Sequence, residues 1–331
     1  MYPHMRLRVN TVFEVARAAG LETAYADKHP AYDLVRGPSG KGLSEGYFPE
    51  IAAVNNTNVT AIIEYDQLHV NAWLDWIDGI TPVNASITSG GAKITGIPAI
   101  FGGNFQCVSV AQKVVEYNND SSISTGMLKA FDFVDSSLGQ IVAKLQKKGY
   151  YDDTLIIIAS KHGQAPINPT LWNQVDPDAL QNATNVPVAF LTTDDIGLFF
   201  LNHSSDTAAA VANLNAQKAA LKINETISGA ALIAQGFGDP TKDPAVPDII
   251  VRPNLGTCYY AGHAKTAEHG GLSDDDRKVA CFVSNPGLKR TVYSQRVSTK
   301  QVAPTILKAL GLDPSALKGV VTEGTKLLPG F

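Results

Sequence analysis

A short apolar strand with a polar tip, Thr154–Gln164, constrains the fold of this chain more than any other stretch. The segment from Thr154 to Ala159 (TLIIIA) is rich in β-branched residues and too short for a long helix, so it predicts a buried β-strand. Lys161-His162-Gly163 follows directly. Parallel α/β sheets place their ligand-handling groups at the carboxyl ends of strands. The sequence therefore predicts a functional corner at Lys161 and His162.

The residues before this strand predict a long amphipathic helix, from Gly126 to Lys148. Apolar residues recur at spacings of three and four from Phe131 to Leu145, and Gly149 follows as a C-cap. Helix, short turn, apolar strand and polar tip is the repeating unit of a parallel α/β sheet. We therefore expect an α/β fold with a mostly parallel sheet and helices on both faces.

The pattern changes between residues 166 and 247. This segment predicts two strands around Asp194-Asp195, which we expect to form a hairpin turn, followed by an Ala-rich helix. Core-like strands return at 248–251 and 278–283. We expect residues 1–165 and 248–331 to form the core, and residues 166–247 to form a smaller inserted α+β subdomain.

Composition excludes two classes of function. Apolar residues make up 44% of the 331 residues, charged residues make up 18%, and the net charge is −4 without a basic block. A cationic nucleic-acid-binding face is therefore not expected. No stretch of 18 residues is apolar throughout, so no membrane span is expected.

Other features concern the cellular compartment. The first residues lack a signal-peptide core. The three cysteines form no zinc-ligand spacing, and we expect them to be buried thiols. Seven Asn-X-Ser/Thr sequons favour an extracellular or secretory location for a full-length form; they begin at Asn55, Asn58, Asn84, Asn119, Asn182, Asn202 and Asn224.

A second polar tip, Glu268-His269-Gly270-Gly271, precedes the strand at 278–283. It combines an imidazole with the acidic run Asp274-Asp275-Asp276, which is a plausible composition for a metal or phosphate site. Both His-Gly tips adjoin predicted core strands. We therefore expect His162 and His269 to meet at one edge of the sheet.

These motifs resemble those of the alkaline phosphatase superfamily, and in particular its type I phosphodiesterase/nucleotide pyrophosphatase branch. The resemblance extends over the whole chain and is closest to microbial members with a Lys-His-Gly-Gln tip. It rests on Asp153 to Gly163, Glu268 to Gly271, Ala303 to Leu312, Asp27 to Pro30, Asn104 to Gln106 and Val134 to Ser136.

The resemblance implies an alkaline-phosphatase-like fold and hydrolysis of phosphodiester or pyrophosphate bonds in a small phosphorylated or nucleotide-like substrate. In this family a Thr or Ser attacks phosphorus, with help from one or two divalent ions, usually zinc. By position, His162 and His269 would ligate metal. Asp275 is a candidate ligand or part of an acidic turn, and Asp27 is a candidate ligand or the start of a turn.

Three departures from the family pattern stand out. The strand and nucleophile that open the family's fold have no counterpart before Thr11, so we expect a fragment, an incomplete gene model or a naturally short form. Lys161 replaces a metal-binding Asp, and its ammonium is expected to substitute for a metal's charge beside a phosphate. Asn104 and Gln106 stand near the place of an Asp–His pair and, with Lys28, are expected to bind substrate.

Two alternatives to hydrolysis remain open. The chain is alternatively an inactive relative, or a fragment, that at most binds a phosphorylated ligand. A secreted glycoprotein with a structural role is the third possibility. A serine-hydrolase triad is not expected, because the sequence contains no Gly-X-Ser-X-Gly motif.

Overall fold

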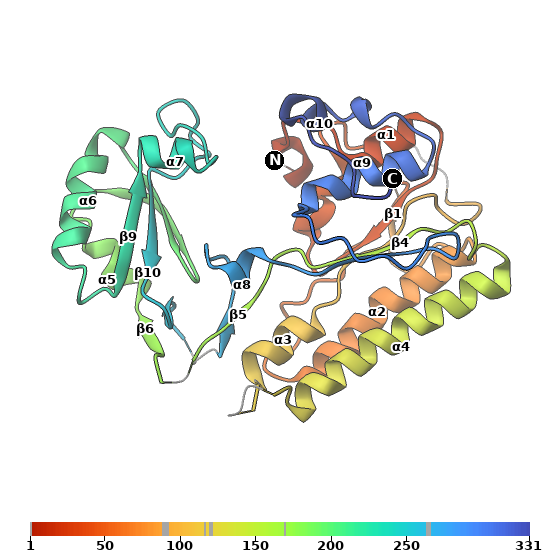
Figure 1. Ribbon diagram of the computed structural model, residues 1–331, viewed down its shortest axis with the longest axis horizontal. Helices are drawn as coiled ribbons and strands as arrows, with labels where there is room; N and C mark the ends of the chain where they lie inside the picture. The colour runs from red at the N-terminus through yellow and green to blue at the C-terminus, as the bar shows by residue number, and fades with distance from the viewer. Residues whose placement is uncertain (1, 88–92, 116, 119–121, 169, 263–265) are drawn as a thin grey trace. The chain divides into compact units, whose positions relative to one another are not determined.

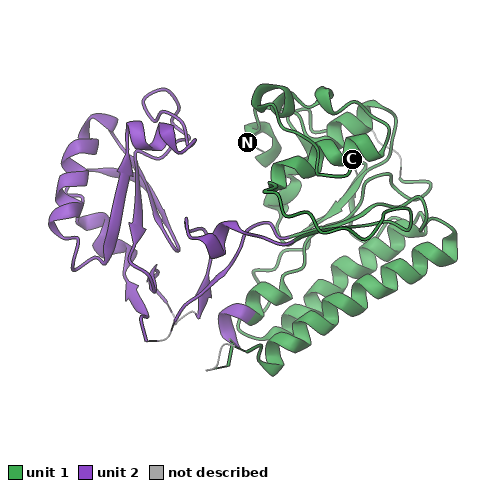
Figure 2. Ribbon diagram, viewed as in Figure 1, with its two compact units in different colours: residues 1–111, 117–159, 281–331 green, residues 112–116, 160–280 purple. Residues whose placement is uncertain are grey.

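The computed structural model describes residues 2–87, 93–115, 117–118, 122–168, 170–262 and 266–331. The chain divides into two compact units, coloured separately in Figure 2. Unit 1 comprises residues 1–111, 117–159 and 281–331, and unit 2 comprises residues 112–116 and 160–280. The predicted core and insertion have other boundaries, and that domain assignment stays a prediction.

Unit 1 contains most of the long helices (Figure 1). Its helices are α1 (Val12–Ala18), α2 (Val59–Ile77), α4 (Thr125–Lys148), α9 (Val302–Ala309) and α10 (Lys318–Glu323), and α3 (Cys107–Val114) begins in it. Its strands are β1 (Ala24–Ala26), β2 (Glu45–Tyr47), β3 (Ser86–Ile87), β4 (Ile156–Ala159) and β13 (Cys281–Ser284).

The predicted long helix is α4, and it lies alongside α2 (Figure 1). Ser124 caps its first turn by accepting a hydrogen bond from Met127 N, and Gly149 ends it in the left-handed conformation. Lys144 and Lys148 near its end both pair with Asp78, which follows α2. The prediction is therefore confirmed to within one residue at its start.

The predicted strand before Lys161 is β4, which pairs antiparallel with β13. Among the described strands β13 is its only partner. The expectation of a fully buried strand is wrong, because Ile158 is 39% exposed and Phe282 on β13 is 64% exposed. An apolar run predicts a strand, but it does not specify what covers the strand's faces.

Strand pairing differs in detail from the single, mostly parallel sheet that the sequence suggested. In unit 1, β1 pairs parallel with β2, and β2 pairs antiparallel with β3. The order of helix, turn and strand along the chain does not determine which strand becomes the neighbour. The mixed helix and sheet content nevertheless agrees with the predicted α/β class.

Unit 2 is built on an antiparallel sheet with the order β7-β8-β10-β9. Its strands are β5 (Ala165–Pro166), β6 (Asn173–Val175), β7 (Val188–Thr193), β8 (Gly197–Leu201), β9 (Ile223–Ser228), β10 (Ile249–Pro253), β11 (Thr257–Tyr259) and β12 (Ala267–Glu268). Its helices are α5 (Pro177–Asn182), α6 (Thr207–Ala216), α7 (Ala230–Ala234) and α8 (Asp274–Arg277). The core of this unit includes the buried residues Phe199, Leu214 and Ile249.

The hairpin predicted at Asp194-Asp195 is present between β7 and β8, and Asp194 N donates to Ile196 O at 3.0 Å. Within the described residues, no helix is both long enough and apolar enough to cross a membrane.

Candidate functional site

The two His-Gly tips meet, as predicted, but they do so in unit 2 beside the separate β5–β12 pair and not at the edge of a large core sheet. Short strands β5 and β12 pair antiparallel, which places Ala165 opposite Glu268. The amide of Gly163 donates to Asp276 O at 2.7 Å. A Cβ at Gly163 would lie 1.8 Å from Asp275 O, so this close approach requires glycine. As a result, the imidazole rings of His162 and His269 lie 4.1 Å apart between centroids.

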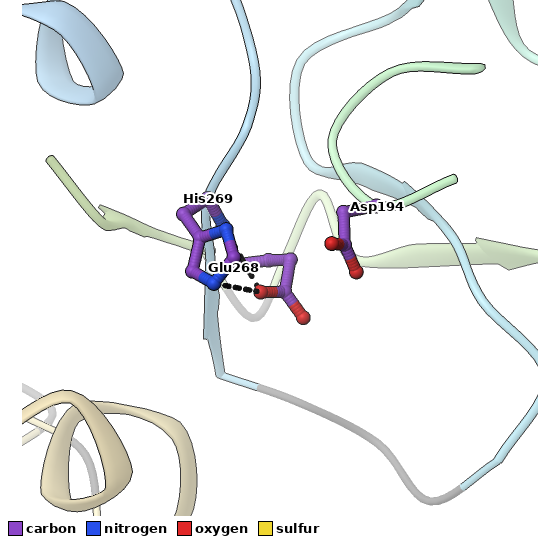
Figure 3. Close-up of side chains that lie close together, drawn as sticks. All are labelled: Asp194, Glu268 and His269. Carbon is purple, nitrogen blue, oxygen red and sulfur yellow. Dashed lines mark hydrogen bonds and ion pairs between the residues drawn. The ribbon is translucent and has the colours of Figure 1, made fainter. Parts of the chain in front are cut away.

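His269 lies beside two carboxylates from distant parts of the chain. One potential ligand atom from each of Asp194, Glu268 and His269 lies within 4.8 Å of the others (Figure 3). Asp194 comes from the β7–β8 turn, whereas Glu268 and His269 come from β12 and the residue after it. One imidazole nitrogen and two carboxylate oxygens are a donor set suited to a divalent metal ion.

The electrostatics of this group keep His269 neutral. Burial lowers the pKa of His269 to about 4, and the positive charge of Lys113 and the neighbouring His162 act in the same direction. Glu268 opposes this shift, because His269 Nε2 lies 3.7 Å from Glu268 Oε1. A neutral imidazole retains the lone pair that a metal requires.

Lys113 provides the counter-charge for Glu268. Its Nζ lies 2.6 Å from Glu268 Oε1, and the Glu268 side chain is fully buried. The backbone around Lys113 is held by Thr266, whose hydroxyl hydrogen-bonds to the carbonyl oxygens of Gln112 and Lys113. The sequence did not single out Lys113. This lysine lies 155 residues before Glu268, and no motif around it indicated that the two side chains would pair.

The remaining predicted residues of unit 2 have different surroundings. His162 Nδ1 lies 2.7 Å from Gly163 O, so the protonated Nδ1 donates there and Nε2 carries the lone pair. Lys161 is exposed, and its charge contributes to lowering the pKa of His269, after burial and the larger effects of Lys113 and His162. Asp275 is exposed on α8 and lies outside the Asp194–Glu268–His269 group. Its role as a metal ligand stays a prediction.

The other predicted site residues, Asp27, Lys28, Asn104 and Gln106, belong to unit 1 and form a group of their own. Lys28 Nζ donates to Gln106 Oε1 at 2.5 Å. Asp27 is buried at the end of β1, where its carboxylate accepts hydrogen bonds from the Tyr25 hydroxyl at 3.0 Å and from Lys28 N at 2.8 Å. Both carboxylate oxygens of Asp27 therefore have protein donors, and its role as a metal ligand also stays a prediction.

Two buried residues on α2, Asp66 and His69, position the Asn104–Gln106 loop, and sequence reasoning missed both. Asp66 Oδ2 accepts hydrogen bonds from the amides of Gln106 and Cys107, both at 2.8 Å. His69 Nδ1 lies 3.1 Å from Asn104 O. Burial raises the pKa of Asp66 to about 6, although these amide donors oppose the shift. The sequence did contain one sign of their role: both are polar side chains on the otherwise apolar face of the helix at residues 59–77.

Comparisons with known proteins identify the family and the fold of this chain. A sequence model described as type I phosphodiesterase/nucleotide pyrophosphatase matches residues 65–277, more than half of the chain. Human ectonucleotide pyrophosphatase/phosphodiesterase 5 superposes with a TM-score of 0.60 at 13% identity, over 92% of this chain and 74% of that one. An inactive murine form of the same enzyme, in complex with AMP, gives 0.60 at 12% identity over 91% and 70%. No curated protein sequence matches significantly. The structural similarity confirms the predicted fold class.

Proposed function

Because this chain belongs to the type I phosphodiesterase/nucleotide pyrophosphatase family, we propose that it is a metal-assisted hydrolase of phosphodiester or pyrophosphate bonds in nucleotide-like substrates. The observation that carries the proposal is the meeting of His162 and His269 beside Asp194 and Glu268 within unit 2. The AMP complex of the murine relative supports a nucleotide as ligand.

Asp194, Glu268 and His269 would hold a divalent ion, which we propose to be zinc. The residues fit such an ion because His269 is neutral, Glu268 is a buried carboxylate and Asp194 supplies a further oxygen. When bound, the ion supplies a Lewis acid that stabilises negative charge on phosphoryl oxygens. The hydrogen bond of His162 Nδ1 to Gly163 O places the lone pair of this imidazole on Nε2, the nitrogen that would ligate a metal. Asp27 in unit 1 and Asp275 in unit 2 each stay a candidate metal ligand.

In each unit, considered by itself, cationic and amide side chains are proposed to bind phosphate or substrate. Lys161 would place an ammonium beside a phosphate in unit 2. Lys28 and Gln106 already hydrogen-bond to each other in unit 1, so they offer one preorganised pair of polar groups. Asn104 belongs to the same loop, which Asp66 and His69 hold in place.

A second candidate function, binding of a phosphorylated ligand without turnover, rests on Lys113 and Lys161. Lys113 already neutralises Glu268 without a metal. Lys161 stands where the family pattern has a metal-binding Asp. Both features suit a site in which ammonium groups substitute for metal charge, and such a site binds phosphate without activating a nucleophile.

We also propose an extracellular or secretory location. The six sequon asparagines among the described residues, all except Asn119, are exposed, which suits N-glycosylation. Asn119 lies outside the described residues.

The test of the hydrolase proposal measures p-nitrophenol release from bis(p-nitrophenyl) phosphate and zinc binding by calorimetry on chelator-treated protein. We expect turnover that a chelator abolishes and zinc restores, and a zinc affinity that falls more than about 100-fold in His269→Ala. The matched control is His203→Ala, an exposed histidine of the same unit. Folded protein that binds zinc and AMP without turnover would refute the hydrolase and support the binding protein.

A further inference from the structure

An exposed stretch of unit 1, residues 286–300, takes no part in the proposed function. It lies between β13 and α9, and every residue in it is exposed. Residues 289–294 form no helix, strand, turn or bend, so the backbone there is extended. Arg290 and residues 292–297 make no hydrogen bond, through backbone or side chain, within the described parts of the chain. Their backbone N–H and C=O groups can therefore pair with a binding partner.

Contacts at both ends hold this stretch in place. At its start, Asn285 Nδ2 donates to Thr154 O at 3.0 Å, just before β4. Near its end, Ser298 N donates to Gln301 Oε1 at 2.7 Å in a capping box. A partner would therefore meet a backbone that is already positioned, which reduces the entropic cost of binding.

The charged residues of this stretch are all basic. They are Lys289, Arg290, Arg296 and Lys300, in a chain whose net charge is −4. Lys300 pairs with Glu323 at 2.9 Å, whereas the other three cations make no ion pair with any described residue. The stretch therefore presents unneutralised positive charge, which attracts an anionic partner.

Apolar and aromatic side chains are interleaved with these cations. The exposed ones are Leu288, Val292, Tyr293 and Val297, and Val292 is 92% exposed. The Tyr293 ring packs against Gly330, where a Cβ would lie 2.6 Å from Tyr293 Oη. Successive side chains of extended backbone point to opposite sides, so Arg290 and Val292 lie on the side opposite Tyr293. This outer side thus combines a guanidinium with an uncovered aliphatic side chain.

These features together distinguish between classes of partner. A purely polar polyanion would neutralise the cations but leave the apolar side chains exposed to water. An anionic lipid surface would meet both the charge and the apolar side chains, but hydrocarbon cannot satisfy unpaired backbone N–H and C=O groups. An extended peptide can satisfy all three requirements, because its own backbone pairs with the exposed one.

We propose that residues 289–297 bind, by β-strand addition, an extended peptide segment in which carboxylates accompany apolar residues. The backbone of the peptide would pair with that of residues 289–297, its carboxylates would meet Arg290 and Arg296, and an apolar side chain would cover Val292. The stretch contains no residue of the Asp194–Glu268–His269 group, so this binding does not depend on the proposed hydrolase activity.

The test measures the fluorescence anisotropy of a fluorescein-labelled probe peptide, Glu-Glu-Thr-Val-Val-Thr-Glu-Glu, titrated with the whole chain. We expect saturable binding. A peptide with Gln in place of every Glu should bind at least about tenfold more weakly, because the charge pairs are lost. N-methylation of both valine amides removes two backbone donors without changing the charge, and it should also weaken binding at least about tenfold.

Variants of the protein locate the binding surface. Arg290→Glu combined with Arg296→Glu should weaken binding of the probe more than about tenfold, and so should Val292→Asp. The matched control combines Lys147→Glu with Lys308→Glu, which reverses two exposed charges of the same unit and should leave the affinity unchanged. All five side chains are exposed, so Tm should stay close to that of wild type in every variant.

Several outcomes would overturn the proposal. Wild-type protein that does not bind the probe would exclude this peptide chemistry, and equal binding of the N-methylated peptide would exclude strand addition. Unchanged affinity in the Arg290, Arg296 and Val292 variants would locate binding elsewhere. Co-sedimentation with phosphatidylserine-containing vesicles, without binding of the probe, would assign the stretch to a lipid surface. Self-association that Arg290→Glu with Arg296→Glu abolishes, again without binding of the probe, would assign it to a second copy of the chain.

Discussion

The buried carboxylate of Asp66 makes the stability of unit 1 depend on pH. Asp66 is fully buried, and its Oδ2 accepts two backbone hydrogen bonds. Its Oδ1 has no hydrogen-bond partner among the described residues and lies 3.9 Å from His69 Nδ1. Burial raises its pKa from the ordinary 3.8 to about 6. Between pH 4 and pH 6 the folded state therefore binds a proton that the unfolded state has lost.

The sign and size of the effect follow from this difference. Since the folded state binds more protons in this window, the free energy of unfolding falls as pH rises from about 4 to about 6. A shift of roughly two pKa units corresponds to about 3 kcal/mol. Asp66→Asn keeps a carbonyl acceptor for the amides of Gln106 and Cys107 and removes the ionisation. Relative to wild type, the variant should therefore gain about 3 kcal/mol between pH 4 and pH 8.

The assay is urea unfolding followed by tryptophan fluorescence, since Trp73 and Trp76 lie in the core of unit 1. Wild type and Asp66→Asn are compared at pH 4, 5, 6, 7 and 8. Asp132→Asn, at an exposed position on α4, is the control. Its free energy of unfolding should change with pH in the same way as that of wild type. A stability difference between Asp66→Asn and wild type that stays constant over this range would refute the reasoning, even if the variant is less stable throughout.

Two further predictions concern buried ion pairs and hydrogen bonds. Lys113→Met removes the ammonium that helps to lower the pKa of His269, so NMR titration should find that pKa raised from about 4. The same variant leaves Glu268 buried without its counter-charge, so thermal unfolding should show a loss of about 3 kcal/mol. Glu45→Ala removes the acceptor for Trp76 Nε1, the Thr81 hydroxyl and Ile94 N, and urea unfolding should show a loss of about 3 kcal/mol. Unchanged stability in either variant would contradict these assignments.

Local sequence signals predicted the parts of the fold that depend on local physics. The apolar spacing of α4 and its Gly149 C-cap identify the helix, because caps and periodicity act within a few residues. The hairpin at Asp194-Asp195 follows from turn preferences in the same way. The exposure of Ile158 on β4 was not predictable, since it depends on which distant segments cover the strand.

The site shows the same division between local and long-range information. The position of the two His-Gly tips beside predicted core strands predicted that His162 and His269 would meet. Asp66 and His69 had no such motif, and their function appears only once the Asn104–Gln106 loop packs on α2. A polar side chain on a buried helix face signals that a partner exists, but it does not identify that partner.

Lys113, which the sequence did not single out, directly contacts one member of the Asp194–Glu268–His269 group. Its ammonium contacts Glu268 Oε1, the same oxygen to which His269 N donates a hydrogen bond at 3.1 Å. Oε1 therefore already has two donors, and the Lys113 ammonium neutralises the buried carboxylate in the absence of an ion. We therefore expect unit 2 to stay folded in chelator-treated protein, so that metal binding and thermal stability can be measured separately.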